Sequence, residues 1–159
     1  MRRLVRTACL GGLAALLVAT GMPAPRADDD MAKIIEYRQR LFKASAEHAI
    51  SIGMILKGEV PFDARHIQWH AEALYAMSKL IIQCFPKGSG SAAGKTEAKD
   101  EIWAHWDKFM ADAVDLERET AKLVEIAKTG DMKATQAQMV IVGKGSCTDC
   151  HDDFVKSGN

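Results

Sequence analysis

The sequence predicts an all-α protein, folded as an up-down-up-down antiparallel four-helix bundle. Four stretches of the 159-residue chain carry apolar residues at steps of three and four, the spacing that places them on one face of a helix. Short segments with glycine, proline or aspartate separate most of these stretches, and short connections make consecutive helices antiparallel. Four helices with one apolar stripe each bury those stripes against one another.

The first helix is predicted over residues 31–57, with Gly58 as its C-terminal cap. The sequence Pro-Phe-Asp at 61–63 predicts a turn whose aspartate is the N-cap of the next helix. That second helix is predicted from residue 64 to about residue 84, because Pro86 disfavours its continuation.

Residues 86–99 are rich in glycine and small polar residues and have no apolar period, so we expect a surface loop. A third, longer amphipathic helix is predicted over residues 100–128 and closed by Gly130. The fourth is predicted over residues 132–156.

Residues 1–27 have the layout of a secretory signal peptide, with three arginines before an apolar run at 8–22. That run is short for a bilayer span. We expect cleavage after Ala27, with Ala24 and Gly21 as other candidates. The competing interpretation keeps the run as a membrane anchor.

The remaining domain, residues 28–159, loses the four arginines of the leader, which leaves 17 basic against 21 acidic residues and a charge of −4 before any cofactor. Such a balance does not favour nucleic-acid binding. Export predicts a periplasmic protein without stable membrane insertion once the leader is removed.

Cys147, Cys150 and His151 form a C-x-x-C-H sequence on the fourth predicted helix, the pattern of c-type haem attachment. Residues three and four apart share a helix face, so both thiols can form thioethers with the haem vinyl groups while the imidazole binds iron. The sequence therefore predicts one covalently bound haem c with His151 as its metal ligand.

Two other interpretations of the cysteines are weaker. A redox dithiol expects a βαβ neighbourhood, whereas this region is predicted to be helical. A structural zinc site needs a fourth ligand, for which Cys84 is the best candidate, and no second paired motif supplies one. With haem on the motif, Cys84 is expected to be a buried small apolar residue, or less simply an intermolecular disulfide partner.

Several short motifs resemble the class II cytochromes c, of which cytochrome c′ is the best-known member. They are Tyr37-Arg38-Gln39, the sequence KGEVPFD at 57–63, Glu101-Ile102-Trp103, and the segment 147–154 with the haem motif. The resemblance covers the whole mature chain. It implies a periplasmic four-helix bundle, usually a homodimer through its first two helices.

The resemblance also implies roles for residues of the first helix. Arg38 and Gln39 match polar residues that lie against the haem propionates, although two solvated side chains remain the alternative. Phe42 matches the residue that faces the open side of the iron, where a phenyl ring offers no lone pair. We therefore expect a five-coordinate haem beside an apolar pocket of Phe42, Ile82 and Phe85. Such a pocket lacks a hydrogen-bond donor for dioxygen and suits nitric oxide or carbon monoxide.

The chain departs from the family at Val155, where cytochromes c′ commonly carry an arginine four residues after the haem histidine. This removes a cation that would favour reduced iron and on which proximal gas chemistry relies. Met77 is the first alternative to test as a sixth ligand. The remaining histidines are expected at the surface: His48, His66, His70 and His105.

Three function classes follow: a gas-binding haem protein, a one-electron carrier that meets a redox partner protein, and an enzyme such as a peroxidase. The last requires a distal acid–base pair, which the predicted pocket lacks, so we expect a non-enzymatic protein. The alternative is a six-coordinate, low-spin electron carrier whose second axial ligand is unidentified.

Overall fold

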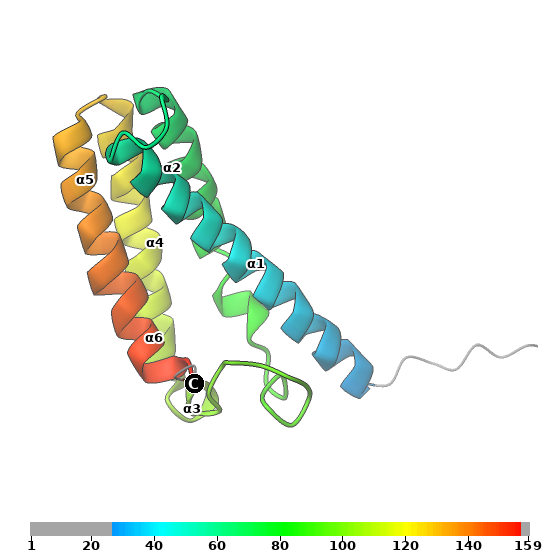
Figure 1. Cartoon of the computed structure of the whole chain (residues 1–159). Helices are drawn as coiled ribbons and strands as arrows, with labels where there is room; N and C mark the ends of the chain where they lie inside the picture. Colours follow the sequence, from blue (N-terminus) through cyan, green and yellow to red (C-terminus); the bar gives the residue numbers. More distant parts are fainter. Residues whose placement is uncertain (1–26, 157–159) are drawn as a thin grey trace, which may run out of the picture.

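A computed structural model of the chain describes residues 27–156 and shows a four-helix bundle, which confirms the predicted fold class (Figure 1). Consecutive helices of the bundle run antiparallel. The helices are α1 (Ala27–Leu56), α2 (Ala64–Ser78), α4 (Trp106–Lys128) and a composite fourth helix of α5 (Met132–Val140), η2 (Ile141–Thr148) and α6 (Asp149–Phe154).

The predicted leader lies, except for Ala27, outside the described residues. Helix α1 begins at Ala27, four residues before its predicted start. None of the helices within residues 27–156 combines the length and apolar character that crossing a membrane requires.

The turn between α1 and α2 has the predicted chemistry. The backbone of Gly58 has a φ of 71°, a conformation that glycine adopts without a steric penalty. The Asp63 carboxylate accepts hydrogen bonds from the backbone N–H groups of Arg65, at 3.0 Å, and His66, at 3.3 Å. It is therefore the N-cap of α2, as predicted.

Helix α2 ends at Ser78, six residues earlier than predicted. The chain then turns into the short 3₁₀ helix η1 (Ile82–Cys84). The third predicted helix is interrupted at His105, which separates α3 (Glu101–Ala104) from α4. The indole Nε1–H of Trp103 in α3 points to the carbonyl oxygens of Phe85 and Pro86, both at 3.2 Å, which holds α3 against the preceding loop.

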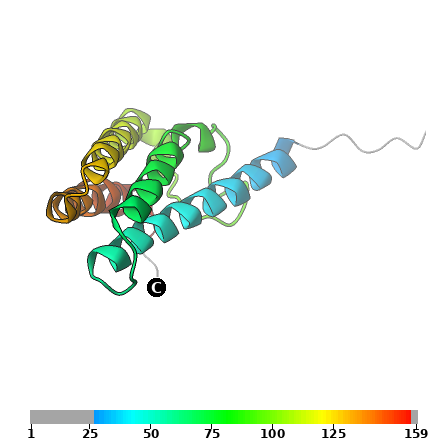
Figure 2. The ribbon, with the colours of Figure 1, turned by 90° about the horizontal axis from the view of Figure 1, so that it is seen from above.

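Residues 86–99 form no helix but are not wholly at the surface. Ser89 and Thr96 are buried, so the prediction of a surface loop is wrong at these positions. The end of the loop pairs with the end of α6: Lys99 N–H donates to the Phe154 carbonyl at 2.9 Å, and Lys156 N–H donates to the Glu97 carbonyl at 2.8 Å. The loop thus closes the end of the bundle that carries the C-x-x-C-H sequence (Figures 1 and 2).

Two apolar clusters form the core. The one nearer the α1–α2 and α4–α5 turns contains Ile52, Ile55, Ile67, Ala71, Leu74, Leu123, Val124, Ala127 and Val142. The other, nearer the 86–99 loop, contains Ile81, Cys84, Phe85, Ile102, Phe109, Ala113 and Phe154. Cys147 packs at the edge of the first cluster and Cys150 at the edge of the second.

Candidate functional site

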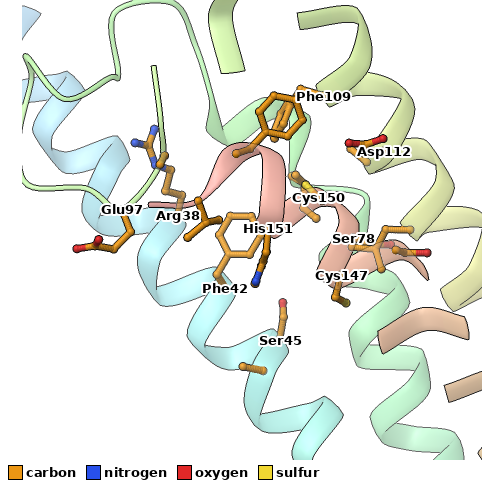
Figure 3. Close-up of a pocket in the computed structure, with 18 of the residues that line it drawn as sticks. Arg38, Phe42, Ser45, Ser78, Glu97, Phe109, Asp112, Cys147, Cys150 and His151 are labelled. Atoms are coloured by element: carbon orange, nitrogen blue, oxygen red, sulfur yellow. The ribbon is translucent and has the colours of Figure 1, made fainter. Parts of the chain in front are cut away.

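The three residues of the C-x-x-C-H sequence line one cavity, at the end of the bundle that the 86–99 loop closes (Figure 3). Cys147 lies in η2, whereas Cys150 and His151 lie in α6. Neither cysteine is in a disulfide within the described part of the chain; both are half-buried, and His151 is exposed. The three side chains therefore lie on one wall of the cavity, as the attachment of a planar group requires.

Segment η2 has the wider turn of a π-helix, in which hydrogen bonds join residues five apart, and the sequence analysis missed it. The Thr148 hydroxyl donates to the Gly143 carbonyl, also five residues back, at 3.0 Å. Gly143 and Gly145, both poor helix formers, were the available signal.

Burial raises the pKa of the Cys147 thiol. It also raises the pKa of Cys150 to about 11, with a smaller contribution from the negative charge of Asp112. Reactive redox dithiols instead depend on a lowered thiol pKa. The pair therefore does not have the electrostatics of a redox dithiol.

The cavity has a volume of about 560 Å³, within the range of small-molecule and cofactor sites. Its walls are largely apolar and come from every helix of the bundle; they include Phe42, Leu74, Ile81, Phe85, Ile102, Phe109, Ala113, Leu116 and Phe154. Ile82, which the sequence analysis placed here, is absent from the lining, and Ile81 is present instead. The early end of α2 and the 3₁₀ turn change the helical phase at this point.

Arg38 is a buried cation at the edge of the cavity, with 2% of its surface exposed. Its two terminal nitrogens donate to the hydroxyls of Ser89 and Thr96, both at 2.9 Å, and its guanidinium carbon lies 4.6 Å from the Phe85 ring centroid. Burial lowers the pKa of Arg38. Among the described residues no carboxylate pairs with it, so the charge is available to an anionic group in the cavity.

The sequence analysis left open that Arg38 and Gln39 are solvated side chains on a surface helix. For Arg38, which is buried, that alternative is wrong. Gln39, the neighbouring predicted residue, is exposed but also lines the cavity, and its amide donates to the Lys95 carbonyl at 3.0 Å. An apolar cavity with two thiols, an imidazole and a buried cation at its rim matches an apolar macrocycle that carries carboxylates.

Phe42 and Ser45 line the cavity from α1, the wall that faces α6 (Figure 3). The Phe42 ring is half-buried and packs edge-on against Phe85, with the ring centroids 6.1 Å apart. The Ser45 hydroxyl makes this wall less apolar than the sequence analysis expected. Its position three residues after Phe42, on the same helix face, was the missed signal.

The other ligand candidates lie elsewhere. Met77 is absent from the cavity lining, and its Sδ accepts a hydrogen bond from the Ser45 hydroxyl at 3.3 Å. His105 is exposed, as predicted, whereas His48, His66 and His70 are half-buried. Of the histidines, His151 is the one that lines the cavity.

Cys84 is buried and donates to the Leu80 carbonyl at 3.1 Å. In residues 27–156, no three histidine, cysteine or acidic side chains are grouped so that they could hold a metal ion by themselves. Val155, in the position of the family arginine, lines the cavity.

Comparisons with known proteins agree with this geometry. A family described as Cytochrome C′ matches residues 33–155. A cytochrome c′ of Pararhodospirillum photometricum is 36% identical over 120 residues, which cover 76% of this chain and 94% of the relative.

Among solved structures, cytochrome c prime from Shewanella frigidimarina superposes with a TM-score of 0.74 at 34% identity, over 80% of this chain and 97% of that one. The nitric oxide complex of a variant of cytochrome c prime from Alcaligenes xylosoxidans gives a TM-score of 0.71 at 28% identity, over 79% and 95% of the two chains. Since the family match spans most of the described bundle and includes the C-x-x-C-H wall of the cavity, the chain belongs to the cytochrome c′ family and is a c-type haem protein.

Proposed function

We propose that this chain is an exported, periplasmic, non-enzymatic protein that binds small gases such as nitric oxide and carbon monoxide at a five-coordinate haem and can exchange single electrons with a redox partner. The observation that carries the proposal is the position of Phe42, an aromatic residue without a donor atom, on the wall that faces the helix of His151. The apolar run at residues 8–22 supports export.

The residues that would hold the haem follow from the cavity. Cys147 and Cys150 would form the two thioethers, and His151 would bind the iron. Arg38 and Gln39 would face the propionates from the rim. When bound, the haem supplies an iron that accepts one diatomic ligand or one electron.

Phe42 controls access to the open side. Its ring packs against Phe85 and must turn away before a ligand enters, which favours small neutral molecules. The relative from Alcaligenes xylosoxidans that was solved as a nitric oxide complex supports this ligand class.

Electron exchange is supported by the exposure of His151, because it places the side of the cavity that carries this histidine near solvent. The six-coordinate alternative requires a second donor, and the described residues that line the cavity include no methionine and no histidine besides His151. A peroxidase would require a distal acid–base pair, and the α1 wall offers Phe42 and Ser45 instead.

A homodimer through α1 and α2 completes the proposal. Apolar side chains project from these helices and their connection, with Ile50 56% exposed, Phe62 52% and Trp69 53%. Exposed apolar patches on soluble proteins commonly mark contact surfaces.

Carbon monoxide titration of the reduced, haem-loaded protein tests the gas-binding proposal. We expect saturable binding and a high-spin, five-coordinate spectrum before the gas is added. A sharp six-coordinate, low-spin spectrum with Phe42 intact, and no uptake of carbon monoxide, would contradict it.

Covalent attachment is tested by the mass of the denatured protein. The mass should include one haem in the wild type and in Cys84→Ser, the matched control for loss of a cysteine. It should be lost when Cys147 and Cys150 are both replaced by serine. A colourless wild-type protein without added mass would contradict the assignment of the cofactor.

A further inference from the structure

We propose that the hydroxyl of Ser45 donates a hydrogen bond to a diatomic ligand held in the cavity and thereby selects among gases by the charge on their outer atom. The inference rests on the proposed gas binding and adds a specificity-determining residue to that site.

Ser45 has the position that this role requires. It lies three residues after Phe42 on α1 and lines the same cavity as Phe42 and His151. Figure 3 shows its oxygen directed toward the His151 side chain, which also lines the cavity. A ligand that displaces the Phe42 ring therefore enters the space next to this hydroxyl.

The hydroxyl is also free to change partner at low cost. At present it points to the Leu41 carbonyl, at 3.0 Å, and to the Met77 sulfur, at 3.3 Å. The Leu41 carbonyl is already the acceptor of the regular helical bond from the backbone N–H four residues on. A thioether sulfur is a weak acceptor. Rotation of the Ser45 hydroxyl toward a ligand thus leaves no buried acceptor without a partner.

The hydroxyls of Ser146 and Ser78, which also line the cavity, do not have this freedom. Ser146 Oγ donates to Asp115 Oδ2 at 3.1 Å. Ser78 Oγ donates to the Tyr75 carbonyl at 2.7 Å and lies 3.2 Å from Thr120 Oγ1 in the buried core. To turn it toward a ligand would break this buried network.

The polar residues at the other end of the α1 wall are engaged as well. Arg38 donates to two hydroxyls of the 86–99 loop, and Gln39 donates to the Lys95 carbonyl of the same loop. Ser45 is therefore the α1 donor in the cavity whose present hydrogen bonds are dispensable.

A donor at this place corrects the expectation of a purely apolar pocket. A hydrogen bond stabilises a ligand in proportion to the negative charge on the atom that accepts it. Bound carbon monoxide gains residence time from this bond, and ligands whose outer atom becomes more negative on binding gain more.

The test compares Ser45→Ala with the wild type in the reduced, haem-loaded carbon monoxide complex. Loss of the donor should raise the C–O stretching frequency in the infrared spectrum and speed dissociation about fivefold, the factor that corresponds to the central value for one neutral hydrogen bond. Ser45→Thr keeps a hydroxyl and should restore both values toward those of the wild type.

Ser51→Ala is the matched control. Ser51 also lies on α1, and its hydroxyl makes the same kind of bond to a carbonyl four residues back, Glu47 O at 2.8 Å, but it does not line the cavity. Its replacement should leave the frequency and the dissociation rate unchanged.

If the wild type binds carbon monoxide and Ser45→Ala shows the same frequency and rate, the role of Ser45 is overturned and the proposed function stands. If the wild type takes up no carbon monoxide, the proposed function fails and the role of Ser45 fails with it.

Discussion

The Nδ1 atoms of His48 and His70 lie 2.8 Å apart across the seam between α1 and α2. The ring centroids are 5.1 Å apart, so the two nitrogens point at each other rather than past each other. One of them must donate and the other accept, because two protonated nitrogens cannot form this contact. The pair is therefore intact with one shared proton and is broken when both rings carry a positive charge.

This pair predicts a loss of stability in weak acid. Burial lowers the pKa of His70 from its ordinary value of 6.5, and the charges of His48 and His66 lower it further. The unfolded chain therefore binds a proton at His70 more readily than the folded chain does. The contribution of His70 to the free energy of unfolding is fully present above pH 6.5 and is lost as the pH drops below that value. The thermal midpoint of the haem-loaded protein, followed from pH 7.5 to pH 5, measures the effect.

Replacement of His70 by glutamine should flatten this pH dependence. His105→Gln is the control, because His105 is exposed and lies at the start of α4. An equal response of both variants to acid would show that His70 is not the source of the acid sensitivity.

The four helices were predictable because their apolar period is local, and the haem motif was predictable because its residues are contiguous. The end of α2 was not predictable in this way. The apolar period continues through Ile81, so nothing in the sequence marks Ser78 as the last residue of the helix. Because the helix ends early, the residues that follow Ser78 face other directions than a continued helix would give them. Ile81 therefore lines the cavity in place of the predicted Ile82.

The environment of Arg38 was hidden for a different reason. Its hydroxyl partners, Ser89 and Thr96, are 51 and 58 residues away in a stretch that has the composition of a solvated loop. Long-range polar pairs leave no periodic trace in a sequence. The resemblance to a family singled out Arg38, but the structure was needed to show that its side chain is buried and hydrogen-bonded to two hydroxyls.

Arg38→Leu should destabilise the protein by about 1–3 kcal/mol, because it removes the hydrogen bonds that the guanidinium donates to the buried Ser89 and Thr96 hydroxyls and releases the 86–99 loop. Urea unfolding measures this change. Arg40→Leu is the control: Arg40 is exposed, its ion pair with Glu36 is 3.8 Å long, and its loss should cost no more than about 0.5 kcal/mol. Equal effects at both positions would argue against a structural role for the buried guanidinium.

Phe42→Ala should speed carbon monoxide binding up to about tenfold, since displacement of a packed ring from its rotamer costs on the order of 0.5–1.5 kcal/mol. Stopped-flow mixing gives the rate. Phe62→Ala, which removes an exposed aromatic ring at the α1–α2 turn, should leave it unchanged.

The companion variant Phe42→Met places a thioether donor at the same position of α1. It should convert at least part of the reduced protein to a six-coordinate, low-spin spectrum. A spectrum identical to that of the wild type would place the Phe42 side chain out of reach of the iron.

Glu119 of α4 is hydrogen-bonded to Gln138 of α5. From this contact we expect a second loss of stability in acid, at a pH well below that of the first. The carboxylate is buried, and Gln138 Nε2 donates to its Oε2 at 2.9 Å and to the Glu119 carbonyl at 3.1 Å. Hydrogen bonds from Lys122, Gln138 and Arg118 lower the pKa of Glu119 to about 2.

Because the folded pKa lies below the ordinary value of 4.5, Glu119 stabilises the fold above that pH, and its contribution is lost as the pH falls from 4.5 toward 2. Glu119→Gln should therefore be less stable than the wild type at pH 7 and should lose less on acidification. Glu125→Gln, whose exposed partner is Lys128 at 2.7 Å, is the matched control. Urea midpoints at pH 7, 4.5 and 3 separate the two variants. If Glu119→Gln is as sensitive to acid as the wild type over this range, another carboxylate is responsible for the transition.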